Sequence, residues 1–391
     1  MLDFQFYSPT EFVFGRGAEA QVGTLIRKHG GSKVLLHYGG GSAERSGLLG
    51  RVRQSLVAAG VAFVELGGVK PNPRDTLVYE GIGLCRHEQV DFLLPVGGGS
   101  VIDSAKAIAM GVPYEGDFWD FYSGKSPSAA LPVGTVLTIA AAGSEGSGDT
   151  VITKEDGLLK RGAGSDLLRP RFSILDPELT CTLPPYQTAC GITDIMAHVF
   201  ERYFTPTTEV EITDRLCEAV LLTMLKEAPR VIADPSNVDA RANILWAGTV
   251  AHTNLCGVGR AQDWNSHGIE HELSAKYDCA HGAGLAVIMP AWMTHCCGRA
   301  PARFAQMAER VFGVTPDPHD PEAVGREGIR RFRAFLARIG MPTTLAELGA
   351  DPKDVPEMIA KLGLGEDGHM DGYVPLSPAD VADIFRIAGE A

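Results

Sequence analysis

The first half of the chain alternates between short apolar runs and amphipathic stretches. Buried strands are predicted at residues 34–38, 61–66, 91–96, 133–139 and 172–175, and shorter strands at 4–6, 12–14 and 151–153. Helices are predicted between them, at 18–28, 47–59, 76–88 and 101–110. Strands that alternate with helices indicate an α/β fold, with a parallel sheet covered by helices on its faces.

The pattern changes at Pro184-Pro185, after which almost every segment has helical spacing. Helices are predicted at 187–204, 209–228, 238–255, 264–276, 284–295, 302–311, 325–339, 356–362 and 378–388. With 391 residues the chain is long enough for two domains. We therefore expect an α/β domain over residues 1–184 and an all-α domain over residues 185–391.

Composition narrows the classes of function. Apolar residues make up 45% and charged residues 21%, which is typical of a soluble globular protein. The formal net charge of −13 argues against nucleic acids and anionic membranes as partners. We expect no signal peptide and no membrane span. The eight cysteines form no Cys-x-x-Cys pair, so we expect reduced thiols in a cytoplasmic protein.

Histidines gather in a short stretch of the second half. His267 and His271 are four positions apart and so share one face of a helix, and His281 follows in a His-Gly-Ala-Gly run. Upstream, Asp194 and His198 repeat the four-residue spacing. One carboxylate and several imidazoles on facing helices can bind one divalent metal. The alternative is ordinary core or surface histidines, but burying such groups unpaired costs on the order of 1–3 kcal/mol each.

Two glycine runs follow predicted strands. Gly97-Gly98-Gly99-Ser100 opens a helix, so its backbone can approach a pyrophosphate while the helix N-terminus supplies N–H groups. Asp103, one turn later, either anchors this loop or reaches cofactor hydroxyls. The alternative is an ordinary tight turn, because the run is not the Gly-x-Gly-x-x-Gly fingerprint.

The second run, Gly39-Gly40-Gly41-Ser42, bears on the choice of coenzyme. Sheet folds that bind NAD typically carry an acid at such a strand end, for the ribose hydroxyls. Here the strand ends in Tyr38 and glycine, and Ser42 and Arg45 can accommodate a 2′-phosphate. Glu44 would oppose that phosphate if its carboxylate pointed inward. The pattern favours NADP, with NAD as the alternative.

These motifs together resemble the iron-containing (group III) alcohol dehydrogenases, in particular their butanol dehydrogenase-like branch of NADPH-dependent aldehyde reductases. The resemblance covers nearly the whole chain. It is carried by Tyr38-Gly39-Gly40-Gly41-Ser42, Pro71-Asn72-Pro73-Arg74, Gly97-Gly98-Gly99-Ser100 with Asp103, Gly143-Ser144-Glu145, residues 172–178, Asp194 to His198, and the His267, His271 and His281 series. It implies a Rossmann-like dinucleotide-binding domain, a helical metal-binding domain, and an active site in the cleft between them.

The resemblance also assigns residues. It implies that Asp194, His198, His267 and His281 are the metal ligands, and that His271 lines the site as a candidate proton relay. The implied cofactor contacts are Gly39, Gly40, Gly41, Ser42, Asn72, Gly97, Gly98, Gly99, Ser100, Thr138, Ser147, Lys160, Leu179 and Thr182. Ser147 departs from the Asn that this branch often carries there. For Lys160, an ordinary surface lysine is the alternative.

The predicted ligand set suits Lewis-acid chemistry. Three neutral imidazoles and one carboxylate leave a divalent ion with a net charge of about +1 and an open position, which can polarise a carbonyl oxygen. Mixed imidazole and carboxylate ligation suits Fe(II) and Zn(II), and copper or nickel would bind it too. The resemblance implies iron, with zinc as the alternative. We therefore expect hydride transfer between NAD(P)H and small neutral aldehydes or primary alcohols, such as butanal and butanol. Relatives of this kind suggest a homodimer.

Three other functions are alternatives to an alcohol dehydrogenase. A lyase of the dehydroquinate synthase family shares the two-domain plan, but needs basic residues around an anionic substrate. A glycerol-phosphate-type dehydrogenase is chemically closer. The predicted metal segments hold few cations, with Arg260 and Lys276 the nearest, which favours small neutral substrates over phosphorylated ones. A non-catalytic metal- or nucleotide-binding protein would be indicated by a missing ligand, and none is missing.

Overall fold

The computed structural model describes residues 1–390. It falls into two compact units, Tyr7–Thr182 and a second unit that combines Met1–Phe6 with Leu183–Ala391. The strand predicted at residues 4–6 is wrong, because residues 1–10 form neither helix nor strand. The Leu2 N–H instead donates to the main-chain oxygen of Gly259 at 2.7 Å, so the N-terminus packs with the helical unit.

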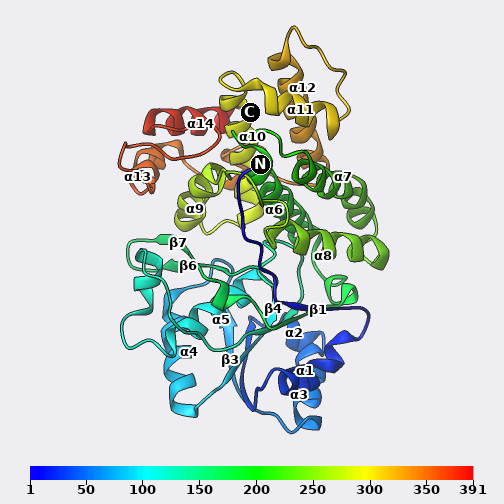
Figure 1. Ribbon diagram of the computed structural model, residues 1–391, viewed down its shortest axis with the longest axis vertical. Helices are drawn as coiled ribbons and strands as arrows, with labels where there is room; N and C mark the ends of the chain where they lie inside the picture. Colours follow the sequence, from blue (N-terminus) through cyan, green and yellow to red (C-terminus); the bar gives the residue numbers. More distant parts are fainter. Residues whose placement is uncertain (391) are drawn as a thin grey trace. The chain divides into compact units, whose positions relative to one another are not determined.

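The first unit is built on a six-stranded sheet (Figure 1). In spatial order the strands are β1 (Glu11–Phe14), β8 (Phe172–Leu175), β5 (Gly134–Leu137), β4 (Phe92–Gly97), β2 (Lys33–Gly39) and β3 (Ala62–Val69). All neighbouring strands are parallel, which confirms the predicted α/β fold. The chain order reverses between β2 and β4, and in such sheets the carboxyl ends at this point form a ligand crevice.

Helices cover both faces of this sheet. Leu35 and Leu93 pack with α4 (Asp75–Glu88) and α5 (Gly99–Gly111) on one face. Their neighbours Val34, Leu36, Phe92 and Leu94 pack with α1 (Val22–Lys28) and α3 (Leu48–Ala58) on the other. Successive strand side chains point to opposite faces, so a strand buried on both sides reads as a continuous apolar run. This explains why the sequence pattern located these strands.

A separate antiparallel ribbon joins β6 (Asp149–Lys154) and β7 (Leu159–Gly164). The strand predicted at 151–153 corresponds to β6, whereas β7 was not predicted. Its Lys-Arg-Gly-Ala-Gly sequence lacks the apolar alternation of a strand. The Asp156-Gly157 pair that precedes it is a hairpin signal, and Gly157 has a φ of 81°.

The second unit is helical. Its helices are α6 (Pro185–Tyr203), α7 (Glu211–Ala233), α8 (Val238–His252), α9 (Asn265–Tyr277), α10 (His281–Cys297), α11 (Pro301–Arg310), α12 (Pro321–Arg338), α13 (Val355–Ala360) and α14 (Pro378–Glu390). Every residue of α6 from Thr188 to Tyr203 is buried, and this helix packs against α7, α8 and α10. Within residues 1–390, no helix is long and apolar enough to cross a membrane.

Candidate active site

The predicted metal ligands come from three helices of the helical unit. Asp194 and His198 lie on α6, His267 on α9, and His281 is the first residue of α10. Asp194, His198 and His267 are buried, with 4%, 5% and 6% exposure, although they are polar. Helix α10 begins three residues earlier than the sequence pattern indicated, and this places His281 at its N-terminus.

The donor atoms of three of these residues converge. Asp194, His267 and His281 each offer a ligand atom within 4.8 Å of the others. Asp194 Oδ1 lies 4.0 Å from His267 Nε2 and 3.8 Å from His281 Nε2. His198 is outside this grouping, but its ring centre is 4.5 Å from that of His267. The structure therefore brings the four predicted ligands into one cluster, with His198 beside the other three.

All three histidines of this cluster use Nδ1 for an internal contact. His198 Nδ1 lies 2.9 Å from the main-chain oxygen of Asp194. His267 Nδ1 lies 2.8 Å from Glu201 Oε1, and His281 Nδ1 contacts Glu270 Oε2. The main-chain oxygen of Asp194 can only accept, so His198 Nδ1 carries the proton, and carboxylate oxygens beside the other two rings favour the same tautomer. Each Nε2 then keeps its lone pair, which is what a metal requires.

The donor set fits a divalent metal. The buried Nε2 atom of His267 has no hydrogen-bond partner among the described residues. Burial and the neighbouring His198 and His281 rings hold the pKa of His267 well below its usual value. A neutral imidazole with an unused lone pair, 4.0 Å from a carboxylate oxygen, matches the ligand chemistry of Fe(II) and Zn(II).

His271 lies at the margin of the cluster. Its ring centre is 5.6 Å from that of His281 and 6.5 Å from that of His267. Glu270, His271 and His281 form a second grouping of donor atoms within 4.8 Å. His271 is half-buried, so solvent reaches it more readily than His267.

Glycines after His281 allow α10 to approach its neighbours closely. A side chain at Gly282 would collide with the main chain of Cys190 on α6. A Cβ at Gly284 would lie 2.6 Å from Glu270 Oε1. The His-Gly-Ala-Gly run therefore brings α10 against both α6 and α9.

Sequence reasoning missed the carboxylates that hold these rings. Glu201 and Glu270 are fully buried, and each is three residues after a histidine on its own helix, His198 and His267. That spacing places acid and histidine on one helix face and was a usable signal. Burial, together with the nearby Asp263, raises the pKa of Glu201 well above its usual value.

The predicted cofactor residues of the α/β unit follow the carboxyl ends of parallel strands. Gly39 ends β2 and Gly97 ends β4, on the two sides of the switch point. Gly40, Gly41 and Ser42 follow β2, Asn72 follows β3, Gly98, Gly99 and Ser100 follow β4, Thr138 follows β5, and Leu179 and Thr182 follow β8. Strands of a parallel sheet share one carboxyl edge, so these residues lie along the edge where such folds bind nucleotides.

Because the residues of the two runs carry no side chains, a pyrophosphate could approach their main-chain N–H groups closely. Nothing lies within 4 Å of a Cβ built at Gly40, and Gly41 has a φ of 113°. Gly98 is the N-cap of the 13-residue helix α5, whose first N–H groups have no intrahelical partner. A side chain at Gly98 would collide with Ile139. The local structure therefore fits a dinucleotide.

Asp103 is held inside the protein. Its Oδ1 accepts from Ser144 Oγ at 2.6 Å and its Oδ2 accepts from the Val151 N–H at 3.0 Å. Lys106 donates to the main-chain oxygen of Ser147 at 2.9 Å. Ser147 is itself buried, and its Oγ accepts from the Asp149 N–H at 3.2 Å. The hydrogen bonds of Asp103 to Ser144 and Val151 favour an anchoring role for Asp103 over a contact with cofactor hydroxyls.

Lys160 and Asn72 are brought together. Lys160, on β7, donates to Asn72 Oδ1 at 3.0 Å, and both residues are buried. The surface alternative for Lys160 is therefore wrong. Asn72 has a φ of 51°, a left-handed conformation that Asn tolerates better than most residues.

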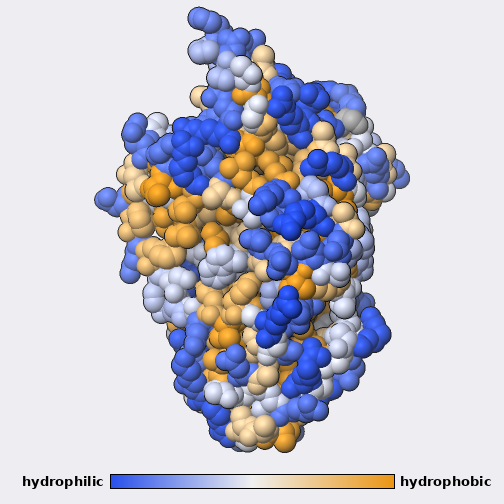
Figure 2. Space-filling model, turned by 90° about the vertical axis from the view of Figure 1, so that its right-hand side faces the viewer, coloured by the Kyte–Doolittle hydropathy of each residue, from blue (hydrophilic) through white to orange (hydrophobic). Residues whose placement is uncertain are grey.

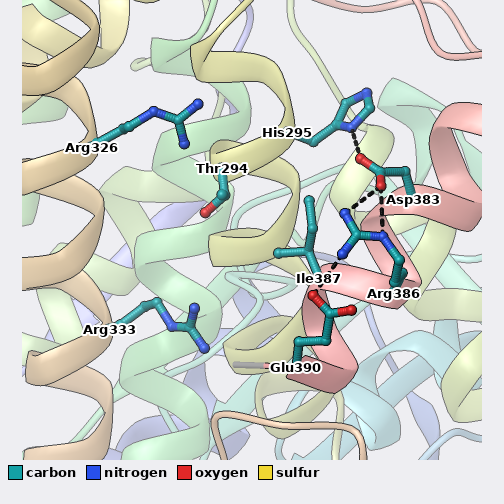
Figure 3. Close-up of a pocket in the computed structure, with 8 residues that line it drawn as sticks. All are labelled: Thr294, His295, Arg326, Arg333, Asp383, Arg386, Ile387 and Glu390. Carbon is teal, nitrogen blue, oxygen red and sulfur yellow. Dashed lines mark hydrogen bonds and ion pairs between the residues drawn. The ribbon is translucent and has the colours of Figure 1, made fainter.

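The helical unit also has a hollow of about 480 Å³ (Figure 3), and two of its lining residues, Thr294 and His295, lie on α10, the helix that begins with His281. Arg326 and Arg333 extend from one wall, while Arg386 pairs with Asp383 and Glu390 on the other, at 2.7 and 2.6 Å. The hollow contains none of the predicted site residues. Its lining is Thr294, His295, Arg326, Arg333, Asp383, Arg386, Ile387 and Glu390.

Comparisons with known proteins match nearly the whole chain. The model of the iron-containing alcohol dehydrogenases matches residues 9–177, and that of the C-terminal region of the Fe-containing alcohol dehydrogenase family matches residues 188–389. The chain is 42% identical to the probable NADH-dependent butanol dehydrogenase 1 of Bacillus subtilis, over 99% of both chains. It is 37% identical to the NADPH-dependent aldehyde reductase YqhD of Escherichia coli, over 93% of both.

A solved structure of a relative matches the fold of the whole chain. The crystal structure of NADH-dependent butanol dehydrogenase A from Thermotoga maritima superposes with a TM-score of 0.95 at 39% identity. The match covers 100% of this chain and 99% of that one.

Proposed function

Because the chain belongs to the iron-containing alcohol dehydrogenase family, we propose that it interconverts small neutral aldehydes and primary alcohols, with butanal and butanol as a representative pair. It is an oxidoreductase of the alcohol dehydrogenase and aldehyde reductase type, and it uses a nicotinamide coenzyme and a metal. The observation that carries the proposal is the convergence of His267 Nε2 and His281 Nε2 on the Asp194 carboxylate.

We propose that Asp194, His198, His267 and His281 bind one divalent ion, either Fe(II) or Zn(II). When bound, such an ion stabilises negative charge on the substrate oxygen, and reduced nicotinamide supplies the hydride. The chain contributes the neutral state and the orientation of its imidazoles. Burial keeps His267 neutral, and the protons on Nδ1 leave each Nε2 free to bind the ion.

His271 is proposed to pass a proton to the substrate oxygen as an alcohol forms. An imidazole ordinarily titrates near neutral pH, so it can both accept and donate a proton there. Its position supports this role, because its ring lies 5.6 Å from that of His281, and it is half-buried rather than sealed in the core.

NADPH is proposed as the preferred coenzyme. Glu44 contacts Arg53 at 2.9 Å, and Arg53 also pairs with Glu65 at 2.9 Å, so one cation is shared between the two carboxylates. The Arg45 guanidinium lies 3.1 Å from a Cβ built on Gly41, where it can meet a 2′-phosphate. The names of the relatives divide, since the Bacillus subtilis protein is called NADH-dependent and YqhD NADPH-dependent.

The remaining proposals concern assembly and location. Hydrophobic residues gather in places on the face that Figure 2 shows. Ile212 and Leu222 on α7 and Trp246 on α8 are exposed hydrophobic side chains, and exposed hydrophobic patches often mark protein contacts. They support a homodimer, which light scattering would test through a mass twice that of one chain. Within residues 1–390, none of the eight cysteines forms a disulfide, which supports a cytoplasmic location.

The function is tested by following absorbance at 340 nm with metal-loaded protein and butanal, with NADPH and NADH in parallel. Oxidation of coenzyme that depends on butanal supports the reaction. NADPH should be used at least tenfold more efficiently than NADH, and the reverse preference would overturn the coenzyme proposal alone. Absence of turnover with both coenzymes, at full metal occupancy and across an aldehyde series, would overturn the proposed function.

A further inference from the structure

Two fully buried carboxylates stand directly behind the proposed metal ligands. Glu201, on α6, lies against His267, and Glu270, on α9, lies against His281. Each contacts the Nδ1 side of its histidine, away from the Nε2 atom that faces Asp194. Neither carboxylate is a proposed metal ligand or the proposed proton relay.

We propose that Glu201 and Glu270 are positioning residues that keep the imidazole proton of His267 and of His281 on Nδ1, so that both Nε2 lone pairs point toward Asp194. The proposal rests on the metal site proposed above. A carboxylate oxygen beside an imidazole nitrogen fixes both the tautomer and the plane of the ring. Without it, the rings can turn and the proton can move to Nε2, where it blocks metal binding.

Glu201 holds His267 at two points. Its Oε1 accepts from the main-chain N–H of His267 at 3.0 Å and from the ring Nδ1–H at 2.8 Å. The same oxygen therefore fixes the start of α9 and the ring that projects from it. If Glu201 only filled space in the core, its Oε1 would not need to accept both hydrogen bonds from His267.

Asp263, two residues before α9, adds hydrogen bonds that hold the start of this helix against Glu201. Its N–H donates to the main-chain oxygen of Glu201 at 2.7 Å. Its carboxylate accepts from the N–H groups of Asn265 at 2.8 Å and Tyr373 at 2.6 Å. Helix α9 is thus tied both to α6 and to the segment before α14, which leaves His267 little freedom to shift.

Glu270 is held by packing. A Cβ at Gly284 would lie 2.6 Å from Glu270 Oε1 and 2.7 Å from its Cγ, so the carboxylate fits against the glycine backbone of α10. This contact points the Oε2 atom at His281, eleven residues along the chain. Gly284→Ala should therefore displace the Glu270 side chain without altering a ligand or a charge.

The test measures Zn²⁺ affinity of the full-length protein, stripped of metal, in competition with a chromophoric chelator. Glu201→Asp withdraws the carboxylate by one methylene group, so it cannot reach both N–H groups of His267. Glu201→Gln keeps an acceptor oxygen at full length. Glu227→Gln is the matched control, because Glu227 is a buried carboxylate of the same unit, 3% exposed, that pairs with Arg230 on α7.

Glu201→Asp and Gly284→Ala should each weaken Zn²⁺ binding by about 10–100-fold, the range seen when the partner of a metal-bound histidine is removed. Glu201→Gln should lose less than Glu201→Asp, and Glu227→Gln should bind Zn²⁺ like the unaltered chain. Circular dichroism establishes that each variant is folded. If Glu201→Asp does not fold, Gly284→Ala decides, and unaltered Zn²⁺ affinity in this variant overturns the proposal.

His267→Ala separates this proposal from the metal site itself. If it loses Zn²⁺ while folded Glu201→Asp and Gly284→Ala bind Zn²⁺ normally, the positioning roles are wrong and the metal site stands. If His267→Ala binds Zn²⁺ like the unaltered chain, both proposals fail.

Discussion

Metal binding should stabilise the helical unit selectively, because every proposed ligand lies between Leu183 and Ala391. A ligand that binds only the folded state stabilises it by about 4 kcal/mol at a free concentration of a thousand times its Kd. For a unit of roughly 200 residues, 1 kcal/mol shifts Tm by about 2–4 °C. Saturating Zn²⁺ should therefore raise the Tm of the helical unit by about 8–16 °C.

The variants His267→Ala and His271→Ala make this prediction specific. His267 offers the buried Nε2 atom that lacks a partner among the described residues, so His267→Ala should lose most of the Zn²⁺-induced shift. His271→Ala should keep the shift, because its proposed role is proton transfer, and should lower turnover and alter its pH profile. Differential scanning calorimetry with and without Zn²⁺ measures the shifts. A full shift in His267→Ala, or none in His271→Ala, would refute the reasoning.

Three further predictions concern the α/β unit. Burial lowers the pKa of His37 to about 4, below the usual value of about 6.5 in an unfolded chain, so the unfolded state binds the extra proton between these values. The unfolding free energy should then fall by about 3 kcal/mol as pH drops from 6.5 to 4, and a His37→Gln variant in urea titrations should lack this part of the slope. Gly98→Ala should weaken NADPH binding at least about tenfold in fluorescence titrations, because its side chain would collide with Ile139 at the start of α5. Gly83→Ala, on α4 with nothing within 4 Å of its Cβ, is the control that should bind NADPH normally. Lys160→Met, which removes the bond to Asn72, should raise the Kd for NADPH while Zn²⁺ content stays unchanged, and a lowered Zn²⁺ content would contradict a role confined to the coenzyme.

The sequence predicted most of the fold because its strands are buried on both faces. Leu35 and Leu93 pack against one helical layer and Val34 and Leu36 against the other, so apolar side chains are required at successive positions. The ribbon strand β7 was not predicted, because it is stabilised by pairing with β6 rather than by an apolar face. The start of α10 was also misplaced, because glycines that weaken a helix are needed there for close packing.

The histidines of the site could be predicted from their spacing, and the spacing of Glu201 and Glu270 hints at a role for these acids, but the histidine that each acid contacts could not be predicted. The four-residue intervals of Asp194 and His198, and of His267 and His271, are visible in the chain. Glu201 and Glu270 look like ordinary exposed acids of a helix until α6, α9 and α10 are packed together. Only that packing shows which carboxylate meets which imidazole, because both contacts join different helices.

The central claim is that metal bound by these histidines is required for aldehyde reduction. The most direct measurement strips the protein with a chelator and then restores Fe(II) or Zn(II) stepwise while butanal-dependent oxidation of NADPH is followed. Activity should vanish in the stripped protein and return in proportion to metal until one ion is bound per chain. His267→Ala should remain inactive at every metal concentration. Full activity in the stripped protein, with no metal detectable by mass spectrometry, would contradict the account.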